Sequence, residues 1–223
     1  MTGSTTTAFP TSFKQQLAQG MHNFSGPQAP TGNVTSGSNT IASVSAETNL
    51  CRGMPISGTG IPAGAFIVDL PTATTMTVYG QPTITNAGVT LTCSGDTFDV
   101  ALIKNGCAGT YGAASTAYSN ITGNSDEASG TGYTAGGQAM TANTTPSTSS
   151  TIAFWSWSTN PSWTGATLNV QGCMIYNASN RGGYAANNAV YVGDFGGEQL
   201  VSAGTLTLVL PTNNSSSAIL RIQ

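Results

Sequence analysis

Residues 98–103 read Phe-Asp-Val-Ala-Leu-Ile, and this stretch guides the interpretation of the whole chain. Phe98, Val100 and Leu102 alternate with the residues between them. A repeat of two residues places successive side chains on opposite faces of a β-strand. The pattern therefore predicts a strand here, and comparable runs follow it along the chain.

Five further apolar runs predict strands in the second half of the chain, at 151–157, 167–176, 188–194, 204–210 and 217–222. Residues 180–183, Asn-Arg-Gly-Gly, predict a hairpin turn between two of them. The Gly, Ser and Thr content of residues 105–150 predicts long surface loops. Consecutive strands with glycine-rich turns and almost no helix predict an antiparallel β-sandwich.

Residues 11–21, TSFKQQLAQGM, predict one amphipathic helix, because Phe13, Leu17 and Met21 recur on one face. The preceding residues show no periodicity. We expect this segment to be an arm that orders on assembly and lays Phe9, with Phe13, on a neighbouring subunit. The alternative is an unattached tail with a helix that packs only on its own sheet.

Residues 28–94 differ from the rest of the chain, since Glu47, Arg52 and Asp69 are their only charged residues. Short strand-like runs near 40–45, 54–57, 65–70, 75–79 and 88–93 are separated by glycine and proline turns. The predicted fold is therefore all-β: an antiparallel β-sandwich host domain, 1–27 plus 95–223, with one N-terminal helix. A small β-barrel or sandwich module, 28–94, is inserted into the host.

Charged residues make up only 6% of the 223 residues, with 5 Lys and Arg against 8 Asp and Glu. No basic cluster is present to neutralise phosphates, so we expect no nucleic-acid partner. No apolar run approaches the ~20 residues that a membrane helix needs, and the first residues lack a signal-peptide pattern. We therefore expect no membrane partner and synthesis in the cytoplasm.

The titratable residues do not suggest an enzyme. Asp126 and Glu127 are adjacent, so an extended chain points them to opposite faces, and we expect them at a loop edge rather than across a substrate. His22 is the single histidine, and the cysteines are scattered without a Cys-x-x-Cys pair. We predict reduced buried thiols, no metal site, no cofactor and no catalytic residues.

Trp155 and Trp157 lie at alternate positions of one predicted strand. Such residues belong more often to a core or a subunit contact than to a sugar-binding platform, which is the alternative. The candidate partner-contact residues are therefore Phe9, Phe13, Trp155 and Trp157.

Three segments resemble small virion structural proteins of tailed bacteriophages: SFKQQLAQGMHNF (12–24), GDTFDVALIKN (95–105) and above all EASGTGYTAGGQ (127–138). Residues 33–92, with RGMPISGTGIPAG at 52–64, resemble a small β-unit of phage fibre and decoration proteins. The resemblance implies a structural role without a catalytic constellation.

From this resemblance we expect a non-enzymatic capsid decoration (cement) or head-fibre subunit. The alternative is a tail, collar or fibre component with a receptor- or glycan-binding role. The expected partners are phage capsid or tail proteins and copies of the chain itself, with a glycan less favoured. The expected location is the virion, after synthesis in the host-cell cytoplasm.

Overall fold

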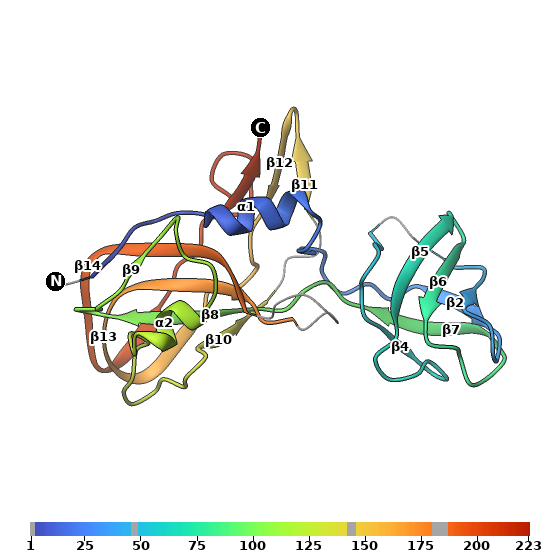
Figure 1. Cartoon of the computed structure of the whole chain (residues 1–223), viewed down its shortest axis with the longest axis horizontal. Coiled ribbons are helices and arrows are strands. Elements are labelled where there is room, and N and C mark those ends of the chain that lie inside the picture. The colour runs from blue at the N-terminus through green and yellow to red at the C-terminus, as the bar shows by residue number, and fades with distance from the viewer. Residues whose placement is uncertain (1–2, 46–48, 142–145, 180–186) are drawn as a thin grey trace. The chain divides into compact units, whose positions relative to one another are not determined.

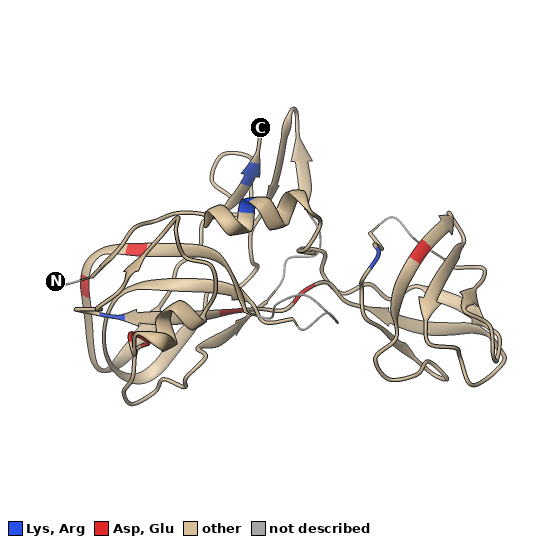
Figure 2. Ribbon diagram, viewed as in Figure 1, with Lys and Arg blue, Asp and Glu red and all other residues tan. Residues whose placement is uncertain are grey.

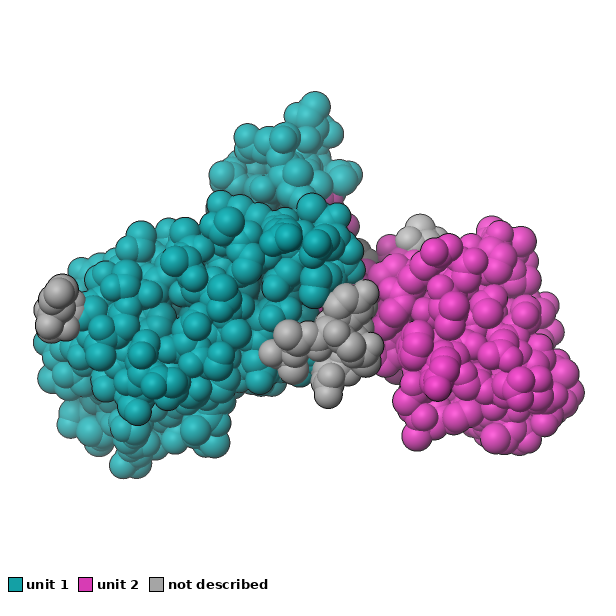
Figure 3. All heavy atoms as spheres, viewed as in Figure 1, with its two compact units in different colours: residues 1–22, 97–142, 148–223 teal, residues 23–96, 143–147 magenta. Residues whose placement is uncertain are grey.

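The computed structural model describes residues 3–45, 49–141, 146–179 and 187–223. The chain is all-β, with curled antiparallel sheets and a short N-terminal helix, as the sequence predicts. It divides into two compact units (Figure 3). Asn23–Asp96 makes up nearly all of unit 2, and unit 1 contains the segments before and after it. Each unit is described by itself.

The main sheet of unit 1 has the order β10-β8-β13-β14 and is antiparallel throughout (Figure 1). Its strands are β8 (Phe98–Lys104), β10 (Gln138–Met140), β13 (Ser162–Asn177) and β14 (Asn188–Thr207). The two longest, β13 and β14, curl together and pair from Ser162 with Thr207 to Asn177 with Asn188. The predicted turn at 180–183 lies outside the described residues.

The strand predicted at 98–103 is central because both of its faces are buried. Phe98 packs against Trp155 and Trp157, with ring centroids 6.2 and 5.5 Å away. On the other face, Ala101 and Ile103 belong to a core cluster with Tyr111, Cys107, Ile121, Met174, Tyr176, Ala189 and Val192. β8 thus joins two apolar layers, which explains why its sequence is apolar at nearly every position.

The N-terminal segment is attached to unit 1. β1 (Ser4–Thr5) pairs in parallel with β9 (Thr110–Tyr111), and Ala8 forms an antiparallel bridge with Val192. Helix α1 (Thr11–Ala18) follows. It ends before the predicted limit of residue 21, because Gly20 adopts a φ of +69°. Phe13 is the buried residue of this helix.

Residues 105–150 are not simply surface loops, which corrects the prediction. They contain β9, a short helix α2 (Ser119–Gly123) and β10, and they bury Tyr111, Ile121 and Asp126. A separate three-stranded sheet joins β11 (Ser147–Ser149), β12 (Ile152–Trp155) and β15 (Leu220–Ile222). Small polar residues are typical of loops, but here backbone N–H groups of this segment donate hydrogen bonds to a buried carboxylate.

The two strands predicted at 188–194 and 204–210 form one strand, β14. Asp194 pairs with Gly172 and Gln199 with Val170, so the residues between Asp194 and Gln199 bulge out of the ladder. Gly196 and Gly197 have φ angles of +75° and +143° there. The glycines therefore make a bulge within a strand rather than a turn between two strands.

Unit 2 is a closed ring of strands. Its two sheets have the orders β2-β7-β4 and β3-β6-β5. Backbone hydrogen bonds join them at both edges: Asn33 exchanges both bonds with Ala42, and Ile67 N–H donates to Met54 O at 2.9 Å. The strands are β2 (Thr31–Val34), β3 (Thr40–Ile41), β4 (Ile56–Gly58), β5 (Phe66–Thr72), β6 (Thr75–Tyr79) and β7 (Asn86–Cys93).

The interior of unit 2 is filled by its own side chains. Met54, Ile67, Met76 and Leu91 are fully buried within one apolar cluster that draws all its members from this unit. At the base of the unit, Asn23 N–H donates to the Asp96 carboxylate and Asp96 N–H donates to Asn23 O, both at 2.8 Å. The chain therefore enters and leaves unit 2 at adjacent points.

Candidate functional site

A buried carboxylate, Asp126, immediately precedes the glycine-rich motif at 127–138. Its oxygens accept hydrogen bonds from the N–H groups of Ala108 (2.9 Å) and Gly109 (2.7 Å) and from the Tyr111 hydroxyl (2.6 Å). The Lys104 ammonium lies 3.2 Å away. Burial would raise the pKa of Asp126, but these hydrogen bonds outweigh it and hold the pKa below its usual value.

Glu127 faces a different set of partners. Its carboxylate accepts hydrogen bonds from the hydroxyls of Tyr118 and Tyr133 and from Gly136 N–H. The Tyr118 ring stacks on Tyr176, with centroids 4.5 Å apart. Burial, followed by the nearby carboxylate, raises the pKa of the Tyr118 and Tyr133 hydroxyls, so both remain protonated donors.

The glycines of the motif let the loop lie directly on the main sheet. A Cβ at Gly137, which has a φ of +81°, would lie 1.8 Å from the carbonyl oxygen of Val100 in β8. A Cβ at Gly130 would lie 2.3 Å from the carbonyl oxygen of Thr167 in β13. Only glycine fits such close backbone approaches.

The motif is therefore a clamp that holds the 105–138 segment on β8 and β13. The expectation that both carboxylates sit at a loop edge is corrected for Asp126, because its side chain is buried. Both carboxylates accept hydrogen bonds from at least three donors each, so both contribute to holding this segment in place. The sequence alone does not indicate which residues donate hydrogen bonds to these carboxylates. Ala108, Tyr111 and Tyr133 are brought to them only by the fold.

Other groups that could support chemistry are similarly engaged. The two ring nitrogens of His22 lie 3.0 Å from Gln16 Oε1 and 2.9 Å from Asn177 Nδ2. Over the described ranges, no group of His, Cys, Asp and Glu could hold a metal ion. Over the same ranges, no helix has the length and apolar character needed to cross a membrane.

Trp155 and Trp157 lie in the core of unit 1, not at its surface. Both are buried, and their rings meet edge to face with centroids 4.9 Å apart. Their placement with Phe98 corrects their selection as partner-contact residues, since neither offers a surface to a partner or a sugar. The cause is β8, whose Phe98 face needs large apolar side chains to cover it.

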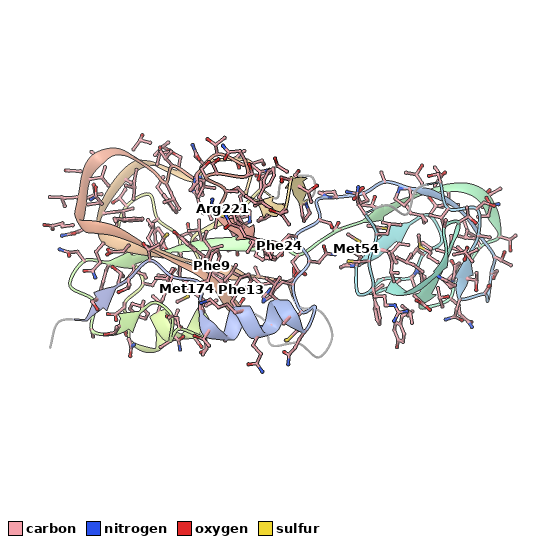
Figure 4. All side chains as sticks on the ribbon, turned by 90° about the horizontal axis from the view of Figure 1, so that it is seen from above. Phe9, Phe13, Phe24, Met54, Met174 and Arg221 are labelled. Carbon is pink, nitrogen blue, oxygen red and sulfur yellow. The ribbon has the colours of Figure 1, made fainter. Side chains whose placement is uncertain are left out.

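Phe9 and Phe13 pack within unit 1 as well. The Phe9 ring stacks on Phe13 at 5.5 Å and meets Tyr191 of β14 at 5.4 Å (Figure 4). Phe13 is buried, whereas Phe9 keeps part of its surface beside Ile219 and Arg221. This placement corrects the expectation of an arm that orders only on assembly and lays Phe9 and Phe13 on a neighbouring subunit.

An apolar groove in unit 1 was not predicted. It has a volume of about 270 Å³ and is lined by residues of β8, β13, β14 and the segment after β14: Leu102, Trp163, Phe195, Gln199, Leu206, Thr207, Leu208 and Val209. Val209 is 74% exposed. The leucine alternation at 204–210 predicted a strand, but it did not reveal that the outer side of this strand has no covering layer.

β14 is the last strand in the order of its sheet, and exposed apolar residues lie on it and elsewhere in unit 1. Leu200 is 71% exposed on this strand, and Ile222 of β15 is also exposed. An apolar groove at the edge of a sheet is typical of protein–protein contacts. The groove lined by Trp163, Leu206 and Val209 is therefore the candidate functional site of unit 1.

Comparisons with protein-family models, with curated proteins and with solved structures gave no match to this chain.

Proposed function

We propose that the chain is a non-enzymatic structural subunit of a bacteriophage virion, a capsid decoration (cement) or head-fibre protein. The observation that carries this proposal is the apolar groove beside β14, in a chain with 6% charged residues. The resemblance of residues 127–138 to virion proteins supports the class of partner. The groove takes an apolar side chain of a neighbouring virion subunit.

The physical argument rests on the type of contact that this surface can make. Burying Val209 and its neighbours removes apolar area from water, at about 25 cal/mol per Å². Contacts of this kind avoid the desolvation cost of ions and change little with salt. A subunit that must stay on a particle through changes in ionic strength benefits from both properties.

The apolar groove would suit a subunit at a tail, collar or fibre position as well as a decoration protein. Copy number separates these positions: a decoration protein is present in hundreds of copies per particle, and a collar or tail part in dozens or fewer. Quantitative mass spectrometry of purified particles measures this ratio directly.

The attachment test compares substitutions of two exposed apolar residues of unit 1. Val209→Asn changes a residue that lines the groove, and Leu200→Asn changes an equally exposed residue of β14 that does not line it. We expect Val209→Asn to lower the occupancy of particles and Leu200→Asn to leave it unchanged. Absence of the wild-type protein from particles would contradict the proposed function, and equal occupancy of both variants would contradict the groove as its attachment point.

A further inference from the structure

The outer face of β5 and β6 in unit 2 carries an exposed aromatic pair. Phe66 and Tyr79 are register partners, with ring centroids 5.0 Å apart and planes 15° from parallel. Phe66 is 38% exposed and Tyr79 is 62% exposed, whereas the next pair, Ile67 and Val78, is buried in the core. The aromatic pair therefore stands on the solvent side of the ring of strands.

Polar groups continue this face beside the aromatic pair. Ile67 pairs with Val78 and Asp69 pairs with Thr77, so Val68 is an additional residue in β5. This bulge returns Asp69 to the outer face, next to Thr77. Thr40 of β3 is the register partner of Thr77 on its other side and is also exposed.

Asp69 also forms an ion pair with Arg52. The segment after Arg52 runs beside β5, because Gly53 N–H donates to Ile67 O at 2.7 Å. Arg52 and Asp69 are the charged residues that the structure describes between 28 and 94 (Figure 2). Apart from Asp96 at the base of the unit, the charged side chains that the structure describes in unit 2 thus lie together, and both remain exposed to solvent.

We propose that this face binds a neutral sugar, a hexose or N-acetylhexosamine unit of a glycan. The C–H groups of a pyranose ring pack on the electron-rich face of an aromatic ring, which the exposed Tyr79 ring offers. The paired Asp69 and Arg52 supply a carboxylate acceptor and guanidinium donors for adjacent sugar hydroxyls. Thr77 and Thr40 add hydroxyl groups that both donate and accept.

The size of the aromatic surface favours a sugar over a second protein. Aromatic side chains present roughly 150–250 Å² each, so the exposed fractions of Phe66 and Tyr79 leave on the order of 200 Å². A stable protein interface buries about 800 Å² on each partner. The patch matches the footprint of one or two sugar rings, and the two aromatic side chains alone would supply only about a quarter of such an interface.

This inference concerns unit 2 and does not rest on the proposed function of unit 1. The test uses the full chain and saturation-transfer NMR with a panel of free hexoses, N-acetylhexosamines and their disaccharides. We expect transfer to the ring C–H protons of at least one of these sugars. Tyr79→Ala is expected to weaken its binding by about tenfold, whereas Tyr79→Phe is expected to retain binding.

Two further variants complete the test. Asp69→Asn is expected to weaken binding through loss of the carboxylate acceptor, and Leu200→Asn in unit 1 is expected to have no effect. Circular dichroism and thermal unfolding confirm that each variant is folded. Absence of transfer to every sugar of the panel, or binding that survives Tyr79→Ala, would overturn the proposal. Self-association that depends on Phe66 in size-exclusion chromatography would overturn it as well, in favour of a protein contact.

Discussion

The hydroxyl of Tyr111 donates a 2.6 Å hydrogen bond to the carboxylate of Asp126, and both residues are buried. Asp126 immediately precedes the glycine-rich motif, and Tyr111 lies in β9, which pairs with the N-terminal strand β1. One carboxylate thus links the motif to the N-terminal segment. The stability of unit 1 should therefore depend strongly on this residue.

Asp126→Asn is expected to destabilise unit 1 by about 2–4 kcal/mol, because the amide nitrogen would face the N–H donors of Ala108 and Gly109. Tyr111→Phe removes one hydrogen bond and should cost about 1–2 kcal/mol. Urea denaturation measures both effects. Asp69→Asn in the exposed ion pair of unit 2 is the control, with an expected change below about 1 kcal/mol. Equal changes in unfolding free energy for Asp126→Asn and Asp69→Asn would contradict the role of Asp126 in the clamp.

The pKa of Asp126 also predicts how stability changes with pH. Its folded pKa lies below the unfolded value of about 3.9. The unfolded state therefore binds the proton more tightly, and the contribution of ionised Asp126 is fully present above that value. It is lost as pH falls through the lower folded pKa.

Asp99 has the opposite sign, because burial raises its pKa more than the Tyr176 hydrogen bond lowers it. Its contribution is present at low pH and is lost as pH rises through the folded pKa. Unfolding free energies measured from about pH 3 to 7 should fall toward acid in the wild type. The slope should flatten in Tyr111→Phe and become steeper in Asp99→Asn. Identical profiles in all three proteins would contradict both assignments.

Gly137→Ala is expected to destabilise the protein by about 3 kcal/mol or more, because the new Cβ would collide with the Val100 carbonyl oxygen at an unfavourable φ. Gly106→Ala is the matched control. Gly106 also has a positive φ, +67°, but open space surrounds the position of its Cβ. Its substitution should cost only about 1 kcal/mol, and thermal unfolding should rank the two variants in this order.

The cysteines should differ in reactivity with an aromatic disulfide reagent at about pH 8. Cys51 is partly exposed, whereas Cys93, Cys107 and Cys173 are buried. Burial raises the pKa of Cys93 to about 11 and that of Cys173 to about 12, which removes the reactive thiolate. We expect fast modification of Cys51 alone and release of the others by denaturant. Fast reaction of Cys173 in the folded protein would contradict its placement.

Excision of residues 28–94 with a short Gly-Ser bridge is expected to leave unit 1 folded. The core clusters of the two units share no residues, and the hydrogen bonds between Asn23 and Asp96 hold the cut ends together. Near-ultraviolet circular dichroism would report the buried tryptophans of unit 1. Loss of that signal would show that the two units depend on each other for folding.

Local patterns in the sequence predicted the strands well and the contacts between distant residues poorly. β6 was predicted at 75–79 and occupies Thr75–Tyr79, because its alternation of two residues is clean and a turn lies on each side. β14 was predicted as two strands, since a Gly-Gly pair signals a turn unless the neighbouring strand continues past it. The residues around the Gly-Gly pair do not indicate that β13 continues past it, because that depends on the pairing of two strands in the fold.

The same limit explains the results for the candidate site. The sequence pattern of Trp155 and Trp157 suits an interface or a core equally well. They lie in the core because they pack on the Phe98 face of β8. No local pattern marks Phe66 and Tyr79 as a pair, because only the pairing of β5 with β6 places them side by side on the outer face. The sequence predicts that Asp126 and Glu127 point to opposite faces, and in the fold each carboxylate has its own hydrogen-bond partners. No pattern in the neighbouring residues indicates that Asp126 is buried.

The paired ends of unit 2 have a consequence for how this protein can change over generations. Asn23 and Asp96 close the base of the unit, so unit 1 requires only that its two chain ends be brought to the same point. Recombination that exchanges the intervening DNA for any domain with adjacent termini would preserve that requirement. The surface chemistry of unit 2 can then be replaced in a single genetic event, without selection having to rebuild unit 1.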